Sequence, residues 1–185
     1  MEIIFSLMMI LFLIFLNFYC FNIAQGQKKL SENIATQIIV GIPVRLYIPS
    51  LNINTHLESV GLTSEGAVEV PKSYTNAAWY NLGPRPGEIG NSIIDGHSGW
   101  KNGIQSIFDD LYKIKKGDKI YIIDEKGIVV TFIVREFRSY GPNEDVSIVF
   151  NSDDSKAHLN LITCVTSNMI QESPNDRFIV FSDKE

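Results

Sequence analysis

Short β-type runs, each stopped by glycine, proline or a polar cluster, dominate the chain from Ile38 onward. The runs cover residues 42–48, 53–60, 67–70, 77–80, 91–95, 120–124, 128–137, 159–164 and 178–181. The turn Glu125-Lys126-Gly127 predicts a hairpin between two of them, because glycine accepts the positive φ that a tight turn needs. Many short strands at this spacing are typical of a β-barrel or a β-sandwich.

One segment departs from this pattern and predicts a helix. Its apolar residues recur at helical spacing, with polar residues between them: Ile104, Ile107, Phe108, Leu111 and Ile114. Lys115-Lys116-Gly117 then supplies a basic last turn and a glycine suited to a helix C-terminus. We therefore expect a mainly β domain with one or two short helices.

The N-terminus predicts a membrane anchor. Residues Ile3 to Ala24 carry no charge and would span roughly 33 Å as a helix, enough to cross a bilayer. The segment lacks the basic start and small-residue cleavage site of a signal peptide, so we interpret it as a retained anchor. The expected organisation is an anchor at residues 1–25, a linker at 26–37 and a β domain at 38–185.

Composition excludes one class of partner and leaves the orientation of the anchor open. The net charge is −5, and no basic stripe is present that could neutralise phosphates, so we expect no nucleic-acid partner. Lys28 and Lys29 follow the anchor, which by the positive-inside tendency favours a cytoplasmic β domain.

The residue with the most chemical potential is Cys164, the only cysteine outside the N-terminal hydrophobic segment. An unpaired thiol in an oxidising compartment is a liability unless it is used, so we consider it a nucleophile. His97, just past a predicted strand end, is the best placed histidine, whereas His158 begins the strand of the cysteine itself. Arg177 opens the next strand and could pair with Cys164.

Each of these residues also has an ordinary structural interpretation. A cysteine near a strand end is more often a small buried hydrophobic residue than a nucleophile. A histidine after a glycine is usually a loop residue, and an arginine at a strand edge usually forms an ion pair or contacts solvent. The residue types alone therefore do not decide between an enzyme and a binding module.

The motif Leu161-Ile162-Thr163-Cys164, with Arg177 downstream and Asp95-Gly96-His97 upstream, resembles the sortases, the cysteine transpeptidases of Gram-positive cell surfaces. Asn160 replaces the first threonine of the family signature threonine-leucine-any-threonine-cysteine, and the other fixed positions match. The resemblance extends over residues 40–185 and is most like class F. Further matching segments are Gly66 to Pro71, Trp79-Tyr80, Pro86 to Asn91 and Lys116-Gly117-Asp118.

The resemblance implies an eight-stranded β-barrel and a thiol mechanism. Cys164 would attack the threonine carbonyl of a C-terminal sorting signal of the leucine-proline-any-threonine-glycine type, forming a thioacyl enzyme. His97 would protonate the departing amine and then deprotonate an acceptor amine, and Arg177 would bind the substrate backbone or the oxyanion. Thr163 would position the substrate or contribute to the oxyanion site.

The resemblance also implies where the protein works and with what. The partners would be surface proteins bearing a sorting signal, an amine acceptor such as a peptidoglycan precursor or a pilin, and the membrane, with the catalytic domain extracellular. No cofactor is implied, and we predict no metal site. One class of the family binds calcium through loop carboxylates, and the acidic residues weighed for that role here are Glu144, Asp145, Asp153 and Asp154.

Two alternatives remain open at the level of sequence. The chain could be another envelope thiol peptidase or transpeptidase, although those enzymes usually place histidine and glycine directly before the cysteine. It could also be a non-enzymatic barrel that binds surface proteins. Asp95 next to Gly96-His97 is an unusual residue for the family and could raise the pKa of the histidine if it lies close.

Overall fold

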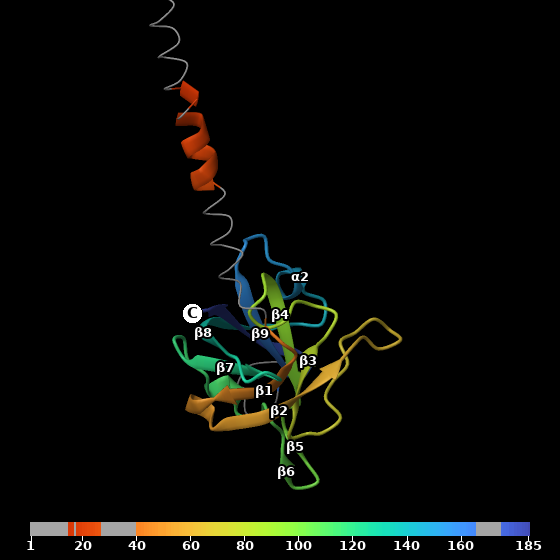
Figure 1. The fold of residues 1–185 in the computed structure, drawn as a ribbon. Helices are drawn as coiled ribbons and strands as arrows, with labels where there is room; N and C mark the ends of the chain where they lie inside the picture. Colours follow the sequence, from red (N-terminus) through yellow and green to blue (C-terminus); the bar gives the residue numbers. More distant parts are fainter. Residues whose placement is uncertain (1–14, 17, 27–39, 166–174) are drawn as a thin grey trace, which may run out of the picture. The chain divides into compact units, whose positions relative to one another are not determined.

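Eight strands close into a β-barrel in the computed structural model (Figure 1), which describes residues 15–16, 18–26, 40–165 and 175–185. The barrel strands are β1 (Pro43–Ile48), β2 (Ile53–Val60), β3 (Ala77–Tyr80), β4 (Gly90–Gly96), β7 (Lys119–Asp124), β8 (Val129–Tyr140), β9 (Ala157–Cys164) and β10 (Arg177–Lys184). Their order around the barrel is β1-β2-β3-β4-β9-β10-β8-β7, and β7 pairs with β1 to close it. The predicted eight-stranded barrel is therefore confirmed.

Two pairs of neighbouring strands are parallel, and the others are antiparallel. β2 runs parallel to β3, and β4 runs parallel to β9. The predicted hairpin joins β7 to β8, and Gly127 in its turn has φ +80°. Because β4 and β9 are parallel while β10 runs back against β9, the end of β4, the end of β9 and the start of β10 lie at one end of the barrel.

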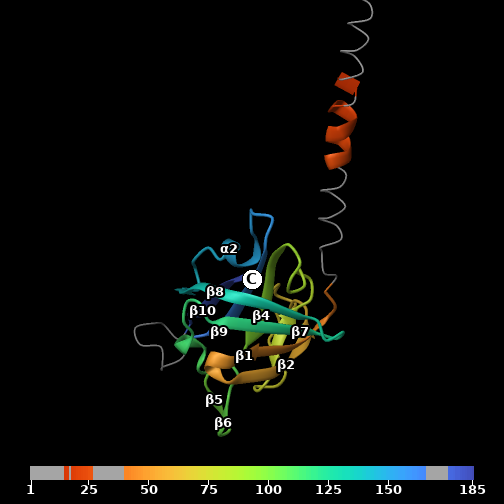
Figure 2. The ribbon, with the colours of Figure 1, turned by 60° about the vertical axis from the view of Figure 1, so that its left-hand side comes forward.

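Smaller elements flank the barrel. They are the 3-10 helices η1 (Pro49–Leu51) and η2 (Leu111–Lys113), the two-stranded sheet of β5 (Trp100–Lys101) and β6 (Ile104–Gln105), and the short helix α2 (Ser147–Phe150). The β5–β6 hairpin and α2 lie at opposite ends of the domain (Figure 2). The run at 67–70 is not a strand, since only Val68 forms an isolated bridge there, with Leu62.

The predicted helix over residues 104–117 is wrong. Two of its amide groups bond to distant parts of the chain: that of Ile107 donates to the Tyr74 carbonyl at 2.8 Å, and that of Phe108 donates to the His97 carbonyl at 2.9 Å. The amides of Asp109, Leu111, Lys113 and Ile114 each bond to the carbonyl three residues back, as in turns and 3-10 helices, and not four residues back as in an α-helix. The carboxylate of Asp109 accepts hydrogen bonds from Gly99, Trp100 and Gln105. These long-range bonds replace a helical ladder with turns and the single 3-10 turn η2.

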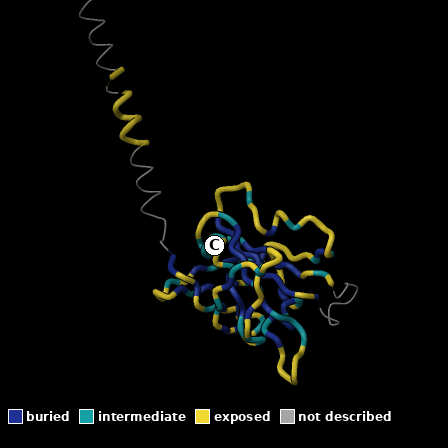
Figure 3. Tube along the Cα trace, turned by 90° about the vertical axis from the view of Figure 1, so that its right-hand side faces the viewer, coloured by how far each residue is buried: buried dark blue, intermediate teal, exposed yellow. Residues whose placement is uncertain are grey.

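The apolar spacing of this segment nevertheless serves the core. Phe108 and Leu111 are fully buried and Ile114 nearly so, whereas Ile104 is 52% exposed. Together with the inward-facing residues of the strands they fill the barrel, and in Figure 3 the buried segments gather in its middle. A second apolar cluster lies on the outside of the sheet beneath α2 and contains Ile93, Tyr140, Val149, Ile162, Ile179 and Phe181.

The chain divides into two compact units, residues Met1–Ile39 and Val40–Glu185. In the first, residues 15–16 and 18–26 are helical. Most of the predicted anchor, residues 1–14 and 17, and the predicted linker from residue 27 onward lie outside the described residues. Within the part of the chain that the structure describes, no helix is long and apolar enough to cross a bilayer.

Candidate active site

The three predicted catalytic residues lie at one end of three neighbouring strands. Arg177, the first residue of β10, pairs directly with Cys164, the last residue of β9. His97 follows the last residue of β4, whose Asp95 is level with Ile162 of β9. His97 and Cys164 each lie two residues beyond this last pair of the two parallel strands. The strand register thus brings together residues that are far apart in the sequence.

The three side chains line one groove on the outer face of the barrel. Alternation along β9 turns Leu159 and Leu161 into the barrel core, which leaves Ile162 and Cys164 facing outward. The groove has a volume of about 550 Å³, and the Cys164 residue is exposed in it. Its other walls are mostly aliphatic and include Leu62, Ala67, Val68, Val70, Val146, Val149, Ile162 and Ile179.

Two contacts fix the ring of His97. Its Nε2 lies 2.9 Å from the carbonyl oxygen of Pro71, and its ring stacks on Tyr74 with 4.5 Å between centroids. A carbonyl can only accept a hydrogen bond, so Nε2 must carry a proton and donate it. The neutral ring then has its lone pair on Nδ1, which is the nitrogen available for proton transfer.

Two side chains tie the strand ends of the site to each other. The Ser98 hydroxyl donates to the Cys164 carbonyl at 2.6 Å, and the Thr163 hydroxyl donates to the Gly96 carbonyl at 2.7 Å. The predicted substrate residue Thr163 is only 1% exposed, and its side chain does not line the groove. The structure therefore places its hydroxyl between the backbones that carry His97 and Cys164.

Asp95 lies in the groove without a partner. It is partly buried, lines the groove with His97 and Arg177, and makes no hydrogen bond or ion pair within the described residues. Burial raises the pKa of this carboxyl to about 7, against the opposing attraction of the Arg177 guanidinium. A carboxyl group that titrates near neutral pH in a cleft is a candidate functional group.

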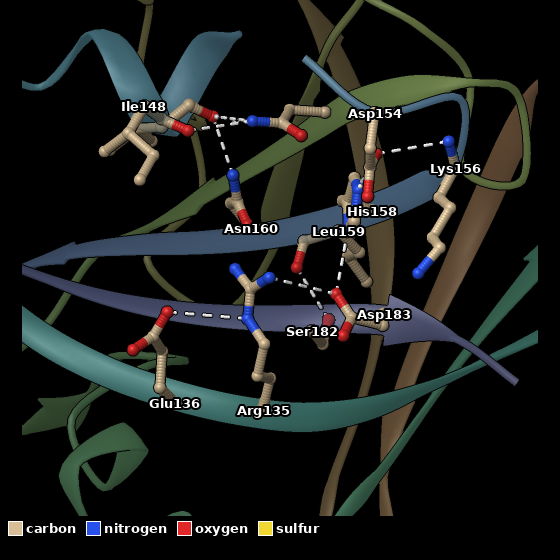
Figure 4. A network of polar contacts seen from close by, with 12 residues as sticks. Arg135, Glu136, Ile148, Asp154, Lys156, His158, Leu159, Asn160, Ser182 and Asp183 are labelled. Atoms are coloured by element: carbon tan, nitrogen blue, oxygen red, sulfur yellow. Dashed lines mark hydrogen bonds and ion pairs between the residues drawn. The ribbon is translucent and has the colours of Figure 1, made fainter. Parts of the chain in front are cut away.

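The α2 wall of the groove is held from below by polar contacts (Figure 4). The buried Asn160 amide donates to the Val149 carbonyl at 2.6 Å, and Asn91 donates to the carbonyls of Ile148 and Val149 at 2.9 and 3.1 Å. The loop after α2 is fastened by His158. Its two ring nitrogens each lie 2.8 Å from a carboxylate oxygen, one of Asp154 and one of Asp183.

The other two histidines, His56 and His158, do not line the groove. His158 lies six positions before Cys164 on β9, and its nitrogens are already bonded to carboxylates. His56 is exposed on β2, level with Arg45 of β1. Sequence reasoning named the three residues that the groove brings together but not the residues that contact them: Pro71, Tyr74 and Ser98 carry no motif, and only the proximity of Ser98 to His97 offered any signal.

Three of the four loop carboxylates weighed for calcium, those of Glu144, Asp145 and Asp154, accept local hydrogen bonds. Glu144 accepts from the Gly141 amide, Asp145 from the Ser147 amide, and Asp154 from Lys156 and His158. Over residues 15–16, 18–26, 40–165 and 175–185, no group of three histidine, cysteine or acidic residues is arranged to hold a metal ion. These residues thus cap their own turns.

Comparison with known proteins gives one family. The model of the Sortase domain matches residues 46–185. Sortase A from Corynebacterium diphtheriae superposes with a TM-score of 0.60 at 20% identity, covering 79% of this chain and 61% of that one. Sortase C1 from Streptococcus agalactiae gives 0.60 at 19% identity, covering 77% and 66%.

Sortase C-1 from Actinomyces oris gives a TM-score of 0.59 at 21% identity, covering 77% of this chain and 74% of that one. The matched region is less than two thirds of the length of the Corynebacterium and Streptococcus chains. No curated protein sequence matches this chain.

Proposed function

Because this chain belongs to the sortase family, we propose that it is a thiol transpeptidase that cleaves C-terminal sorting signals and transfers the protein to an amine. The observation that carries the proposal is that Cys164, directly opposite Arg177 on the neighbouring strand, and His97, the residue after β4, line one groove of about 550 Å³. A nucleophile, a proton carrier and a cation around one cleft are the groups that acyl transfer requires.

The first half-reaction forms a thioacyl enzyme. Cys164 Sγ attacks the carbonyl carbon of the scissile amide, and the thiol proton passes to Nδ1 of His97. Arg177 stabilises the negative charge that develops on the carbonyl oxygen, a contribution of about 3 kcal/mol in a cleft of this kind. The carbon–nitrogen bond then breaks, and the proton on Nδ1 goes to the departing amine.

The second half-reaction reverses these roles with a new amine. The acceptor nitrogen attacks the thioester carbon, and Nδ1 of His97 takes the proton that this nitrogen loses. The carbon–sulfur bond then breaks, and Nδ1 gives its proton to the departing Cys164 thiolate, which restores the thiol. Water in place of the amine gives hydrolysis. The bond from Nε2 to Pro71 keeps the ring in one orientation, so that Nδ1 is the nitrogen that gains and loses the proton in both steps.

The substrate we propose is a surface protein with a signal of the leucine-proline-any-threonine-glycine type, cut between threonine and glycine. The mostly aliphatic walls of the groove suit the leucine and proline of such a signal. The acceptor would be a peptidoglycan precursor or a pilin amine.

We further propose that residues 1–25 anchor the chain in the membrane once, with the catalytic domain outside the cell. The family supports this orientation, whereas Lys28 and Lys29 favour the opposite one. Labelling of Cys164 on intact cells by a membrane-impermeant maleimide is the expected result. Labelling only after lysis would contradict it.

The test of the activity uses the full chain in mild detergent with a library of fluorogenic sorting-signal peptides. We expect cleavage, a thioacyl adduct on Cys164 seen by intact mass, and loss of both in Cys164→Ala. Arg177→Lys should also lose most activity, because lysine lacks the planar fork of donors. Binding without cleavage by the folded wild-type chain would instead indicate the non-enzymatic alternative.

A further inference from the structure

We infer that Asp95 forms a polar subsite in the groove and selects substrates carrying an uncharged hydrogen-bond donor within about two residues of the attacked carbonyl. The donor would be the hydroxyl or amide of a serine, threonine, asparagine or glutamine side chain. This inference rests on the proposed transpeptidase function and adds a specificity-determining residue to it.

The strand register places Asp95 next to the reacting row. On the outer face of the sheet, Asp95 of β4 is level with Ile162 of β9, which is level with Ile179 of β10. The row of His97, Cys164 and Arg177 lies two residues further along, a separation of roughly 7 Å. A peptide whose carbonyl meets Cys164 therefore brings a neighbouring side chain over Asp95.

The surroundings of Asp95 make this contact selective. The residues level with it on the neighbouring strands, Ala78, Ile162 and Ile179, are aliphatic, and the carboxyl group has no hydrogen-bond partner within the described residues. In the free protein, Asp95 is partly buried and lines the groove. A bound peptide would cover it further, and an aliphatic side chain over it would leave a buried carboxyl without a hydrogen bond, which is unfavourable.

A donor on the substrate removes this penalty in either protonation state. The burial that raises the pKa of Asp95 to about 7 means that both the neutral and the ionised form are populated at physiological pH. Each form has an oxygen that accepts a hydrogen bond. A lysine or arginine of the substrate is disfavoured, because Arg177 already attracts Asp95 and would repel a second cation.

The experiment compares matched peptides on the full chain in detergent. In each pair a donor replaces an aliphatic residue of similar shape, threonine against valine or asparagine against leucine, at each position within two residues of the cleaved bond. At one position we expect the wild type to prefer the donor about ten- to a hundredfold in kcat/KM. Asp95→Leu should lose or invert this preference, and Asp95→Asn should keep it.

Asp153→Leu is the matched control, because it removes an equal charge from an exposed site outside the groove. It should leave the preference unchanged. Melting curves establish that each variant is folded, and Asp95→Asn carries the test if Asp95→Leu is not. Equal selectivity in wild type and Asp95→Leu, or no donor preference at any position, would overturn the inference while leaving the transpeptidase intact.

Peptide binding to Cys164→Ala, followed by fluorescence anisotropy, separates this inference from the proposed function. If no peptide is cleaved by the wild type but Cys164→Ala binds donor peptides more tightly in a way that Asp95→Leu abolishes, the subsite stands and the transpeptidase reaction does not. Binding without donor preference, or no binding by the folded protein, overturns the subsite.

Discussion

The orientation and tautomer of the His97 ring are set by two neighbouring groups, one backbone carbonyl and one aromatic ring. The Pro71 carbonyl holds the proton on Nε2, and the Tyr74 ring, which has the Lys101 ammonium 4.9 Å from its centroid, covers one face of the imidazole. Neither contact involves an acidic residue. Within the described residues, the ring of His97 is thus oriented by a backbone carbonyl and an aromatic ring.

Asp95 predicts an unusual pH dependence of stability. Its pKa in the folded protein is about 7, above the value of about 4 in an unfolded chain, so the folded state holds a proton that the unfolded state loses. The free energy of unfolding should therefore fall as the pH rises from about 4 to about 7. At pH values above this pKa the Asp95 carboxyl is ionised in both the folded and the unfolded state, so a further rise in pH no longer changes its contribution to the free energy of unfolding.

The variant Asp95→Asn removes this effect. At pH 4 it should unfold at nearly the same denaturant concentration as the wild type, and at pH 8 it should be more stable by on the order of 3 kcal/mol. Urea titrations at a series of pH values measure the difference. Asp153→Asn should show no such trend, and a constant difference between Asp95→Asn and wild type from pH 4 to pH 8 would contradict the prediction.

At the scale of elements, the segment 104–117 shows what apolar spacing can and cannot predict. The spacing correctly indicates which residues face the core, since Phe108 and Leu111 are fully buried. It does not indicate a helix, because the amide groups of Ile107 and Phe108 bond to Tyr74 and His97. Those partners are distant in sequence, so no local pattern could reveal them.

The helix α2 is held against the sheet by side-chain hydrogen bonds and apolar packing, not by strand pairing. It has only four residues, Ser147–Phe150, and is too short to be stable alone. Asn160 and Asn91 bind its carbonyls from the sheet below, and Val149 packs into the outer apolar cluster. Because Val149 and Phe150 line the groove, these amides set the position of one groove wall.

Asn160→Ala should therefore affect substrate binding more than the chemical step. The Val149 carbonyl keeps only its longer bond from Asn91, and the free energy of unfolding should fall by about 1–2 kcal/mol. We expect KM for a sorting-signal peptide to rise several-fold while kcat changes little. Asn151→Ala is the control, because the side-chain amide of Asn151 bonds to the Ser147 carbonyl of the same turn, and it should change neither KM nor kcat. A loss of kcat without a change in KM in Asn160→Ala would contradict the role of Asn160 in placing the groove wall.

At the scale of the molecule, the strand runs predicted a β-barrel or a β-sandwich, and the family resemblance implied the barrel that the structure has. The three residues that the resemblance implied for catalysis, Cys164, His97 and Arg177, line one groove. The order of the strands was not accessible, because β1 pairs with β7 and β4 with β9 across long stretches of chain. Thr163 shows the same limit. Its place in the motif suggested contact with substrate, whereas its hydroxyl bonds to Gly96 on a strand far away in sequence.

Gly96 contacts both the barrel core and the site, so a substitution at this position should change both stability and activity. A Cβ atom at this position would overlap the ring of Phe108, which is fully buried in the barrel core. The Gly96 carbonyl also accepts the Thr163 hydroxyl, and His97 is the next residue. Only glycine allows the strand to approach the ring this closely, so the position of His97 depends on how the core is packed.

Gly96→Ala should lower the free energy of unfolding by about 1–3 kcal/mol, because the core cannot accept another methyl group without moving Phe108 or β4. It should also reduce kcat/KM, since a shift of β4 moves His97 relative to Cys164. Gly61→Ala is the control, because the nearest atom to its new methyl group would be 3.8 Å away. The double variant Gly96→Ala/Phe108→Leu separates crowding from other causes: recovery of both stability and activity is expected when the ring is removed. Failure of the leucine to restore either would show that Phe108 does not connect the core to the site.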